Sequence, residues 1–312
     1  MNKKNNLAII IPAYKAIYLD KTLESIERQT CKDFNVYIGD DNSPYKLDKI
    51  VSKYTQSLNI TYKRFDENLG GSNLIAQWNR CINMSSDEEW IWLFSDDDIM
   101  GYDCVECFYQ EIEKNNGFDL YRFNINVIDS NGNKIKSCKY PEILSVNSFI
   151  KNKLSGKINS YVVEYIFRRK NFINKNGFTV FDLAWNSDDA TWIKLGLDKG
   201  IKTIQNGKVN WRKSEVNISP NNKDIKIVER KIYANIEYLS WLKSFLKANK
   251  IWNINYYRYF ITWYMTNLIT YKCIVNKFEA MNYLHILQKK LNAPYIFYTL
   301  GNIYYKIKAE IK

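Results

Sequence analysis

Short apolar runs that stop abruptly at polar residues recur from the N-terminus to about residue 215. In the clearest of them, residues 90–94 are all large and apolar and lead directly into Ser95 and three aspartates. Runs of this length are typical of strands that are buried on both faces of a parallel sheet. The same pattern predicts strands at residues 7–11, 34–39, 60–64, 90–94, 120–127, 161–168 and 201–204.

Between these runs, apolar residues recur at the spacing of an amphipathic helix. One helix is expected from Leu19 to about Gln29, and the others are expected at 50–54, 74–82, 104–114 and from 187 through Leu197. The segment Ser-Asn-Gly-Asn at 130–133 indicates a hairpin turn. Alternating strands and helices predict an α/β protein with a Rossmann-like central sheet flanked by helices.

The pattern changes near residues 219–222, so we expect a first domain at 1–219 and a C-terminal helical subdomain at 220–312. From residue 224 onward the period is helical, in about four segments that break near Asn249, Asn276 and residues 292–294. Tyrosine, tryptophan and lysine are dense in this subdomain. Two roles stay open for it: contact with anionic lipid, or packing as a helical subdomain or dimer surface.

The net charge of +12 is compatible with nucleic acid, an anionic membrane face or an anionic substrate as partner. A nucleic-acid site would need basic residues where this chain has acids, so no nucleic-acid partner is expected. No apolar stretch approaches twenty residues, and the run at 7–11 is too short for a signal peptide. The expected location is the cytoplasm, with peripheral contact at the inner membrane face left open.

The cysteines and the single histidine do not suggest a metal centre. Cys104 and Cys107 form a CxxC motif, but no second pair and no nearby histidine completes a zinc site. We expect them to cover one face of a helix as reduced thiols. His285 lies in a helical region far from the aspartates, so a histidine base is poorly supported.

Acidic residues follow two of the expected strands. Asp40 and Asp41 follow the second strand, and Asp96, Asp97 and Asp98 follow the fourth. Because ligands of such sheets bind outside the carboxyl ends of the strands, these acids mark a candidate site. Their mutual repulsion needs compensation, for which Mg²⁺ or Mn²⁺ is the simplest candidate. The alternative is a solvated acidic turn whose side chains cap the next helix.

Taken together, five segments resemble the inverting glycosyltransferases of family 2, which have the GT-A fold. These segments are IIIPAYKAIYLDKTLESIERQT, DFNVYIGDDNS, ENLGGS, WIWLFSDDDIM and NSDDATW. The resemblance covers roughly residues 7–219 and leaves the C-terminal helices out. It implies a GT-A sheet of mixed strand direction and the transfer of a hexosyl or N-acetylhexosaminyl group from a nucleotide-diphosphate sugar. The expected donor is a UDP-sugar, and the expected acceptor is a hydroxyl of a glycan or lipid-linked molecule in bacterial cell-surface polysaccharide synthesis.

The resemblance also assigns the donor site. It places Asp96 against the ribose or sugar, and Asp97 or Asp98 on a Mn²⁺ or Mg²⁺ ion. Asp41, with Asp40 beside it, would accept the imide N–H of uracil or thymine, although a capping aspartate in a turn is the alternative. Pro12 and Tyr14 match the loop around the base.

Two helix starts complete the implied site. Gly70, Gly71 and Ser72 precede a helix whose N-terminus suits a diphosphate, unless Ser72 is simply the N-cap. Asp189 is the implied general base, and Asp188 is the alternative if the register differs. Both could instead be carboxylates that the helix dipole favours.

The chain departs from the family pattern where many members carry a late histidine. Here the segment is VNWRKSEVNIS, in which Arg212 and Lys213 could neutralise phosphate instead. The third metal ligand is therefore left open. A non-catalytic nucleotide-sugar-binding or scaffold protein is the alternative function, but retention of the acids at 41, 96–98 and 189 argues against it.

Overall fold

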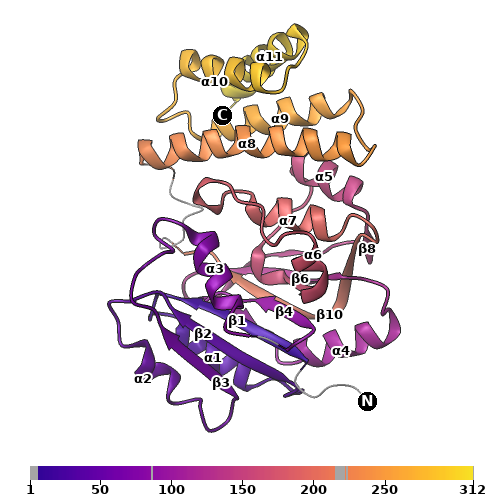
Figure 1. Ribbon diagram of the computed structural model, residues 1–312. Helices are drawn as coiled ribbons and strands as arrows, with labels where there is room; N and C mark the ends of the chain where they lie inside the picture. Colours follow the sequence, from indigo (N-terminus) through magenta and orange to yellow (C-terminus); the bar gives the residue numbers. More distant parts are fainter. Residues whose placement is uncertain (1–5, 86, 215–221, 223, 312) are drawn as a thin grey trace. The chain divides into compact units, whose positions relative to one another are not determined.

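The computed structural model describes residues 6–85, 87–214, 222 and 224–311 (Figure 1). The chain divides into two compact units, which are treated one at a time below. Unit 1 comprises residues 1–146, 160–179 and 191–214, and unit 2 comprises residues 147–159, 180–190 and 215–312. The boundary expected between residues 219 and 220 lies outside the described residues.

Unit 1 is built on a mixed ten-stranded sheet, which confirms the expected fold class. Its first four strands are parallel and stand in the order β3 (Ile60–Arg64), β2 (Phe34–Asp40), β1 (Leu7–Ala13) and β4 (Trp90–Leu93). The order then continues through β9 (Tyr165–Arg168), β6 (Leu120–Ile128), β10 (Ile201–Arg212) and β5 (Ile99–Met100). Strands β7 (Lys134–Cys138) and β8 (Ile143–Leu144) pair with β6 and β10.

Direction changes at β9, which runs antiparallel to both β4 and β6, whereas β10 runs parallel to β6. The expected hairpin is present, because β6 and β7 are antiparallel around residues 129–133. In the parallel part, Ala13 pairs with Asp40, and Phe94 N–H donates to Ile10 O at 2.8 Å. The carboxyl ends of β1, β2 and β4 therefore share one edge of the sheet.

Helices cover both faces of the unit 1 sheet; Figure 1 shows α3 and α1 on opposite sides of β1 and β2. They are α1 (Leu19–Glu27), α2 (Leu47–Val51), α3 (Leu74–Ile82), α4 (Cys104–Lys114), α6 (Arg169–Asn174) and the second half of α7 (Ser187–Leu195). Strand residues from β1, β4 and β6 are fully buried, and Trp92 stacks on Phe123. Cys104 and Cys107 are unpaired and buried on α4, as expected.

Unit 2 is helical. It holds most of α5 (Val146–Leu154), the short turn η2 (Asp182–Ala184), the start of α7, and four long helices, α8 (Ile225–Ala248), α9 (Tyr256–Thr270), α10 (Lys277–Lys290) and α11 (Tyr295–Ile311). The four expected helical segments are thus confirmed. Asp224 caps α8, and a capping box of Asn276 and Glu279 begins α10. Within the described ranges, none of the helices combines the length and apolarity needed to cross a bilayer.

Some expected boundaries were wrong for local physical reasons. Residues 162–164 form a 3₁₀ turn, η1 (Val162–Glu164), instead of strand, because the buried Glu164 carboxylate turns inward to Arg122 and Tyr140. Strand β10 runs on past Ile204 through a register shift, at which Gly207 has φ +74°. Helix α7 ends before Leu197, and the helix expected at 50–54 ends at Val51. The helices α5 and α6 were not expected.

Candidate donor and catalytic sites

Asp96 joins the loop after β4 to the loop after β1. Its Oδ2 accepts hydrogen bonds from the backbone N–H groups of Tyr14 and Lys15, both at 2.8 Å. Burial raises the pKa of Asp96 to about 6, against the opposing charge of Lys15. The loop after β1 therefore holds the Asp96 carboxylate, which the resemblance places on the donor, in a fixed orientation.

Asp97 and Asp98 are compensated in different ways. Asp97 Oδ2 lies 2.9 Å from Lys15 Nζ, whereas Asp98 Oδ1 accepts the backbone N–H of Arg212 at 2.6 Å. Asp98 Oδ2 is buried and has no hydrogen-bond partner among the described residues. Burial, and then the charge of Asp97, raises the pKa of Asp98 well above its usual range. One carboxylate oxygen in this cluster is thus left for a ligand to satisfy.

These residues fit a substrate-shared divalent cation better than an all-protein cage. The described part of the chain contains no group of three or more His, Cys, Asp or Glu side chains placed to hold a metal ion. Mg²⁺ sites in phosphate chemistry usually take one or two carboxylates, with the remaining ligands from substrate and water. Asp97 and Asp98, whose Oδ2 has no hydrogen-bond partner among the described residues, are the two carboxylates that would hold such an ion.

The two aspartates after β2 have separate environments. Asp40 is fully buried and accepts from Ser43 N–H, the Tyr62 hydroxyl and Arg64, so it fixes the strand end. Asp41 accepts from Leu69 N–H and Gly70 N–H, each at 2.8 Å, and from the Arg80 guanidinium. A carboxylate offers about four lone-pair positions, so three donors leave Asp41 with one.

The glycines of the following loop allow this approach to Asp41. A Cβ on Gly70 would lie 2.6 Å from Asp41 Oδ2, and one on Gly71 would lie 2.8 Å from Asn68 Oδ1. The suggestion that Ser72 is the N-cap of α3 was wrong. Asn73 caps the helix, because its side chain accepts a hydrogen bond from Ala76 N–H at 3.0 Å. The hydroxyl of Ser72, the residue before Asn73, donates instead to Leu69 O.

Pro12 and Tyr14 lie at the same edge. Pro12 pairs in register with Gly39, and Tyr14 O accepts the Ser43 hydroxyl at 2.6 Å. Tyr14 is 41% exposed. The loops after β1 and β2 are therefore tied together, with an aromatic ring left at the surface.

Arg212 is buried beneath this edge. Its guanidinium lies 4.2 Å from the centre of the Tyr18 ring and donates to the carbonyls of Asp97, Asp129 and Ser130. These contacts hold backbone in place. Its role toward phosphate stays a prediction.

Asp188 and Asp189 belong to unit 2, at the start of α7. Asp189 is 2% exposed; its Oδ2 lies 2.8 Å from Lys153 Nζ, and its Oδ1 has no hydrogen-bond partner within the described ranges. Burial and the charge of Asp189 raise the pKa of Asp188 to about 7. Asp189 therefore has one carboxylate oxygen bound to Lys153 and one with no hydrogen-bond partner among the described residues.

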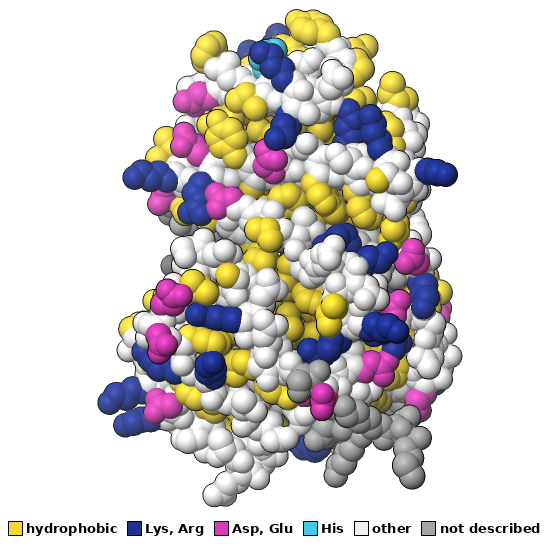
Figure 2. All heavy atoms as spheres, viewed as in Figure 1, with side chains coloured by type: hydrophobic (Ala, Val, Ile, Leu, Met, Phe, Trp, Pro, Cys, Tyr) yellow, Lys and Arg dark blue, Asp and Glu magenta, His cyan; other side chains and the backbone are white. Residues whose placement is uncertain are grey.

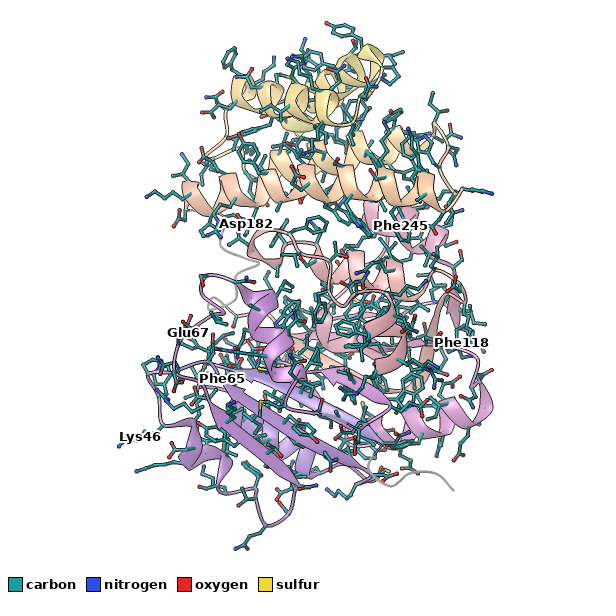
Figure 3. The ribbon with its side chains drawn as sticks, in the orientation of Figure 1. Lys46, Phe65, Glu67, Phe118, Asp182 and Phe245 are labelled. Atoms are coloured by element: carbon teal, nitrogen blue, oxygen red, sulfur yellow. The ribbon has the colours of Figure 1, made fainter. Side chains whose placement is uncertain are left out.

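Sequence reasoning missed three cations at these sites. Lys15 follows Tyr14 directly, so its position after a strand was a usable signal. Arg80 lies on the polar side of α3; it stacks 3.9 Å from the centre of the Phe65 ring and donates to Glu67 O at 2.8 Å (Figure 3 labels Phe65 and Glu67). Neither Arg80 nor Lys153 carries a motif that would reveal it.

Known structures and sequences resemble this chain over different lengths. The UDP complex of S. aureus TarS residues 1–349 is 15% identical with a TM-score of 0.58, covering 99% of this chain and 92% of that one. The UDP-GlcNAc complex of the same protein is 17% identical, again with a TM-score of 0.58, covering 98% and 92%. At these identities the likeness establishes a shared GT-A fold.

A sequence relative in Methanocaldococcus jannaschii, described as an uncharacterized glycosyltransferase, is 32% identical over 124 residues. The match spans 39% of this chain and 41% of that relative. The model described as glycosyl transferase family 2 matches residues 8–177, which is more than half of the sequence. The chain therefore belongs to glycosyl transferase family 2.

Proposed function

We propose that this glycosyltransferase moves a sugar from a UDP-sugar to an acceptor hydroxyl with inversion at the anomeric carbon. One observation carries the proposal. The ends of β1, β2 and β4 are bonded into one acidic edge, through Asp41 N–H to Ala13 O at 2.9 Å and Tyr14 N–H to Asp96 at 2.8 Å. A nucleotide-sugar site on an α/β sheet is expected at such an edge.

The remaining lone-pair position of Asp41 supports a uracil or thymine base as ligand. An imide N–H can donate to it, whereas cytosine and adenine have no such group. TarS, whose fold this chain shares, forms complexes with UDP and UDP-GlcNAc. We therefore infer a UDP-sugar of the hexosyl or N-acetylhexosaminyl class, with dTDP as the second choice.

Mn²⁺ or Mg²⁺ is part of the proposal, held by Asp97 and Asp98 together with oxygens of the donor. When bound, the ion would act as a Lewis acid toward the diphosphate leaving group. The chain's own residues orient the site: Lys15 and Arg212 hold the aspartate loop, and Asp41 holds the loop at Gly70.

Asp189 is the proposed general base. The acceptor hydroxyl would give its proton to Oδ1 of Asp189 while its oxygen bonds to the anomeric carbon. The bond from that carbon to the diphosphate oxygen breaks, and the electron pair leaves with UDP. The buried Oδ1, which has no hydrogen-bond partner in the described part of the chain, supports this role.

A nucleotide panel tests the donor proposal. UDP, dTDP, GDP and CDP are titrated with and without Mn²⁺ while the melting temperature of the protein is recorded. UDP should stabilise most, dTDP second, and both only with metal; the Asp97→Ala/Asp98→Ala variant should lose the effect. Stabilisation by GDP or CDP alone would contradict the assignment. UDP binding without turnover of any UDP-sugar would favour the non-catalytic alternative.

For the acceptor, we infer a glycan or lipid-linked hydroxyl reached from the cytoplasmic side of the membrane. Helix α11 supports this, because Ile296, Leu300, Ile303 and Ile307 form an exposed apolar stripe next to Lys306 and Lys308. Figure 2 shows hydrophobic and basic side chains interleaved over α10 and α11. Such a helix face suits an anionic bilayer.

A sedimentation assay tests the membrane contact. The protein should pellet with vesicles of phosphatidylglycerol and phosphatidylcholine but not with phosphatidylcholine alone, and Leu300→Asp/Ile303→Asp should stay in the supernatant. Dimerisation without lipid binding would assign the stripe to a second copy instead.

A further inference from the structure

The two acids at the start of α7 face a lysine from another helix. Lys153 of α5 places its Nζ 2.8 Å from Oδ2 of Asp189. The Asp189 side chain is 3% exposed and that of Lys153 is 20% exposed. This is therefore a largely desolvated ion pair between Lys153 and the second of two neighbouring acids.

The third element against the pair is α8, which contributes Tyr238. Its hydroxyl is buried and has no hydrogen-bond partner among the residues that the structure describes. Burial, followed by the charges of Asp189 and Asp188, raises the pKa of Tyr238 well above its usual range. Tyr238 therefore stays neutral and cannot offset the negative charge.

Two adjacent carboxylates, of which Asp189 is buried and Asp188 is half-buried, cannot both keep their charge at low cost beside one ammonium. The ammonium contact favours the negative charge on Asp189, so a proton shared by the two acids would reside on Asp188. Burial, together with the charge of Asp189, raises the pKa of Asp188 to about 7, in agreement with that division.

We propose that Lys153 is the positioning residue that makes Asp189, and not Asp188, the general base, by holding the Asp189 carboxylate ionised and in a fixed orientation. This inference rests on the proposed function. Lys153 binds Oδ2, so Oδ1, which no other described residue contacts by a hydrogen bond, keeps its lone pairs for the acceptor hydroxyl. A general base needs a negative charge, a fixed orientation and an oxygen that can accept a proton. The ion pair with Lys153 supplies the charge and the orientation, and it leaves the accepting oxygen unused.

The test compares three substitutions on α5 and α7 in the full chain. Lys153→Met removes the ammonium, Lys153→Arg keeps a cation, and Asp188→Asn removes the competing acid. Lys151→Met is the matched control, because Lys151 lies on the same helix and its Nζ is 5.8 Å from the Tyr256 ring centre. The rate of UDP release from UDP-GlcNAc and UDP-glucose is measured from pH 5 to 9.

In Lys153→Met, the acidic limb of the pH–rate profile should move up by at least one pH unit, and kcat at pH 6 should fall at least tenfold. The KM for donor should be unchanged. Lys153→Arg should recover most of the rate, Asp188→Asn should move the limb to lower pH, and Lys151→Met should match the wild type. An unmoved profile in Lys153→Met would overturn the proposal.

A second readout separates this inference from the proposed reaction. Carboxyl ¹³C NMR of aspartate-labelled protein follows the acid pair without any turnover. The titration of the pair should shift upward in Lys153→Met and stay in place in Lys151→Met. If it shifts but no protein releases UDP, the ion pair stands and the proposed reaction fails. If Lys153→Met does not fold, the Asp188→Asn profile decides, and an unchanged limb there refutes the inference.

Discussion

The edge of the unit 1 sheet and the start of α7 in unit 2 each crowd carboxylates together, but they tolerate them differently. At the edge, every aspartate has its own donor: backbone N–H groups for Asp96, Lys15 for Asp97, and the Arg212 N–H for Asp98. At α7, two acids lie beside one lysine. The separate donors at the edge fix the orientation of each carboxylate, although burial still raises the pKa of Asp96 and Asp98. At α7, one lysine contacts Asp189, and the two acids have unequal environments.

This difference suits the two kinds of chemistry. In the proposed reaction, a cation and a diphosphate need several fixed oxygens at once, which this edge would supply. A proton transfer needs one charged oxygen and no competitor nearby. The predictions below remove a charge or a donor from one cluster at a time.

The largest effect is expected from Asp189→Asn. Removing the base should lower kcat about a thousandfold, which corresponds to about 4 kcal/mol of transition-state stabilisation. UDP should still raise the melting temperature, because its binding groups are untouched. Asp198→Asn, which changes an exposed acid just after α7, should keep wild-type turnover. A fully active Asp189→Asn variant would show that the acids at the start of α7 do not supply the general base, and the proposed difference in role between the two clusters would then be wrong.

Asp188→Asn should change how stability depends on pH. Because burial raises the pKa of Asp188 to about 7 from an ordinary 3.8, the folded chain binds a proton that the unfolded chain has lost. Stability from this group is therefore lost as pH rises toward 7, by about 3 kcal/mol between pH 5 and pH 8. The variant should lack that loss, as measured by urea unfolding at both values. If the free energy of unfolding changed equally with pH in the wild type and in Asp188→Asn, the raised pKa of Asp188 would be contradicted.

Asp98→Asn should stabilise the ligand-free protein while abolishing its metal response. The amide oxygen can still accept the Arg212 N–H, and a buried carboxyl no longer lies beside Asp97. We expect a gain of about 1 kcal/mol, or about 2 to 4 °C in melting temperature. The extra stabilisation by UDP with Mn²⁺ should disappear in thermal shift assays. A retained metal response would exclude Asp98 as a ligand.

The smallest effect is expected from Lys15→Met. Backbone N–H groups continue to hold Asp96, and the Lys15 side chain is 27% exposed, so the loss should stay below about 1 kcal/mol. Mn²⁺ should restore that stability by taking over the charge on Asp97. Calorimetry with and without Mn²⁺ checks both statements; a loss of stability well above about 1 kcal/mol would show that the edge also depends on one lysine.

The sequence pattern predicted the alternation of strands and helices and the acidic edge of the sheet, because both follow from local rules. Apolar runs such as residues 90–94 identify buried strands, and parallel strands bring their carboxyl ends together. The cap of α3 was misplaced by one residue, because Ser72 and Asn73 are both good N-caps and only the backbone path selects Asn73.

The side chains that pair with these acids could not be predicted from local sequence rules. Lys153 and Asp189 are far apart in sequence, and nothing in the α5 segment predicts which lysine turns inward. Likewise, the turn at 162–164 depends on Glu164 pairing with Arg122 across the sheet. Contacts of this kind are set by tertiary packing.

The bonds that hold Asp41 to Leu69 and Gly70 have a consequence for donor affinity. Because these hydrogen bonds already fix the backbone of the loop that would receive the nucleotide, little conformational entropy remains to be lost on binding. A side chain at position 70 would displace the carboxylate, so that preorganisation depends on the absence of a single methyl group.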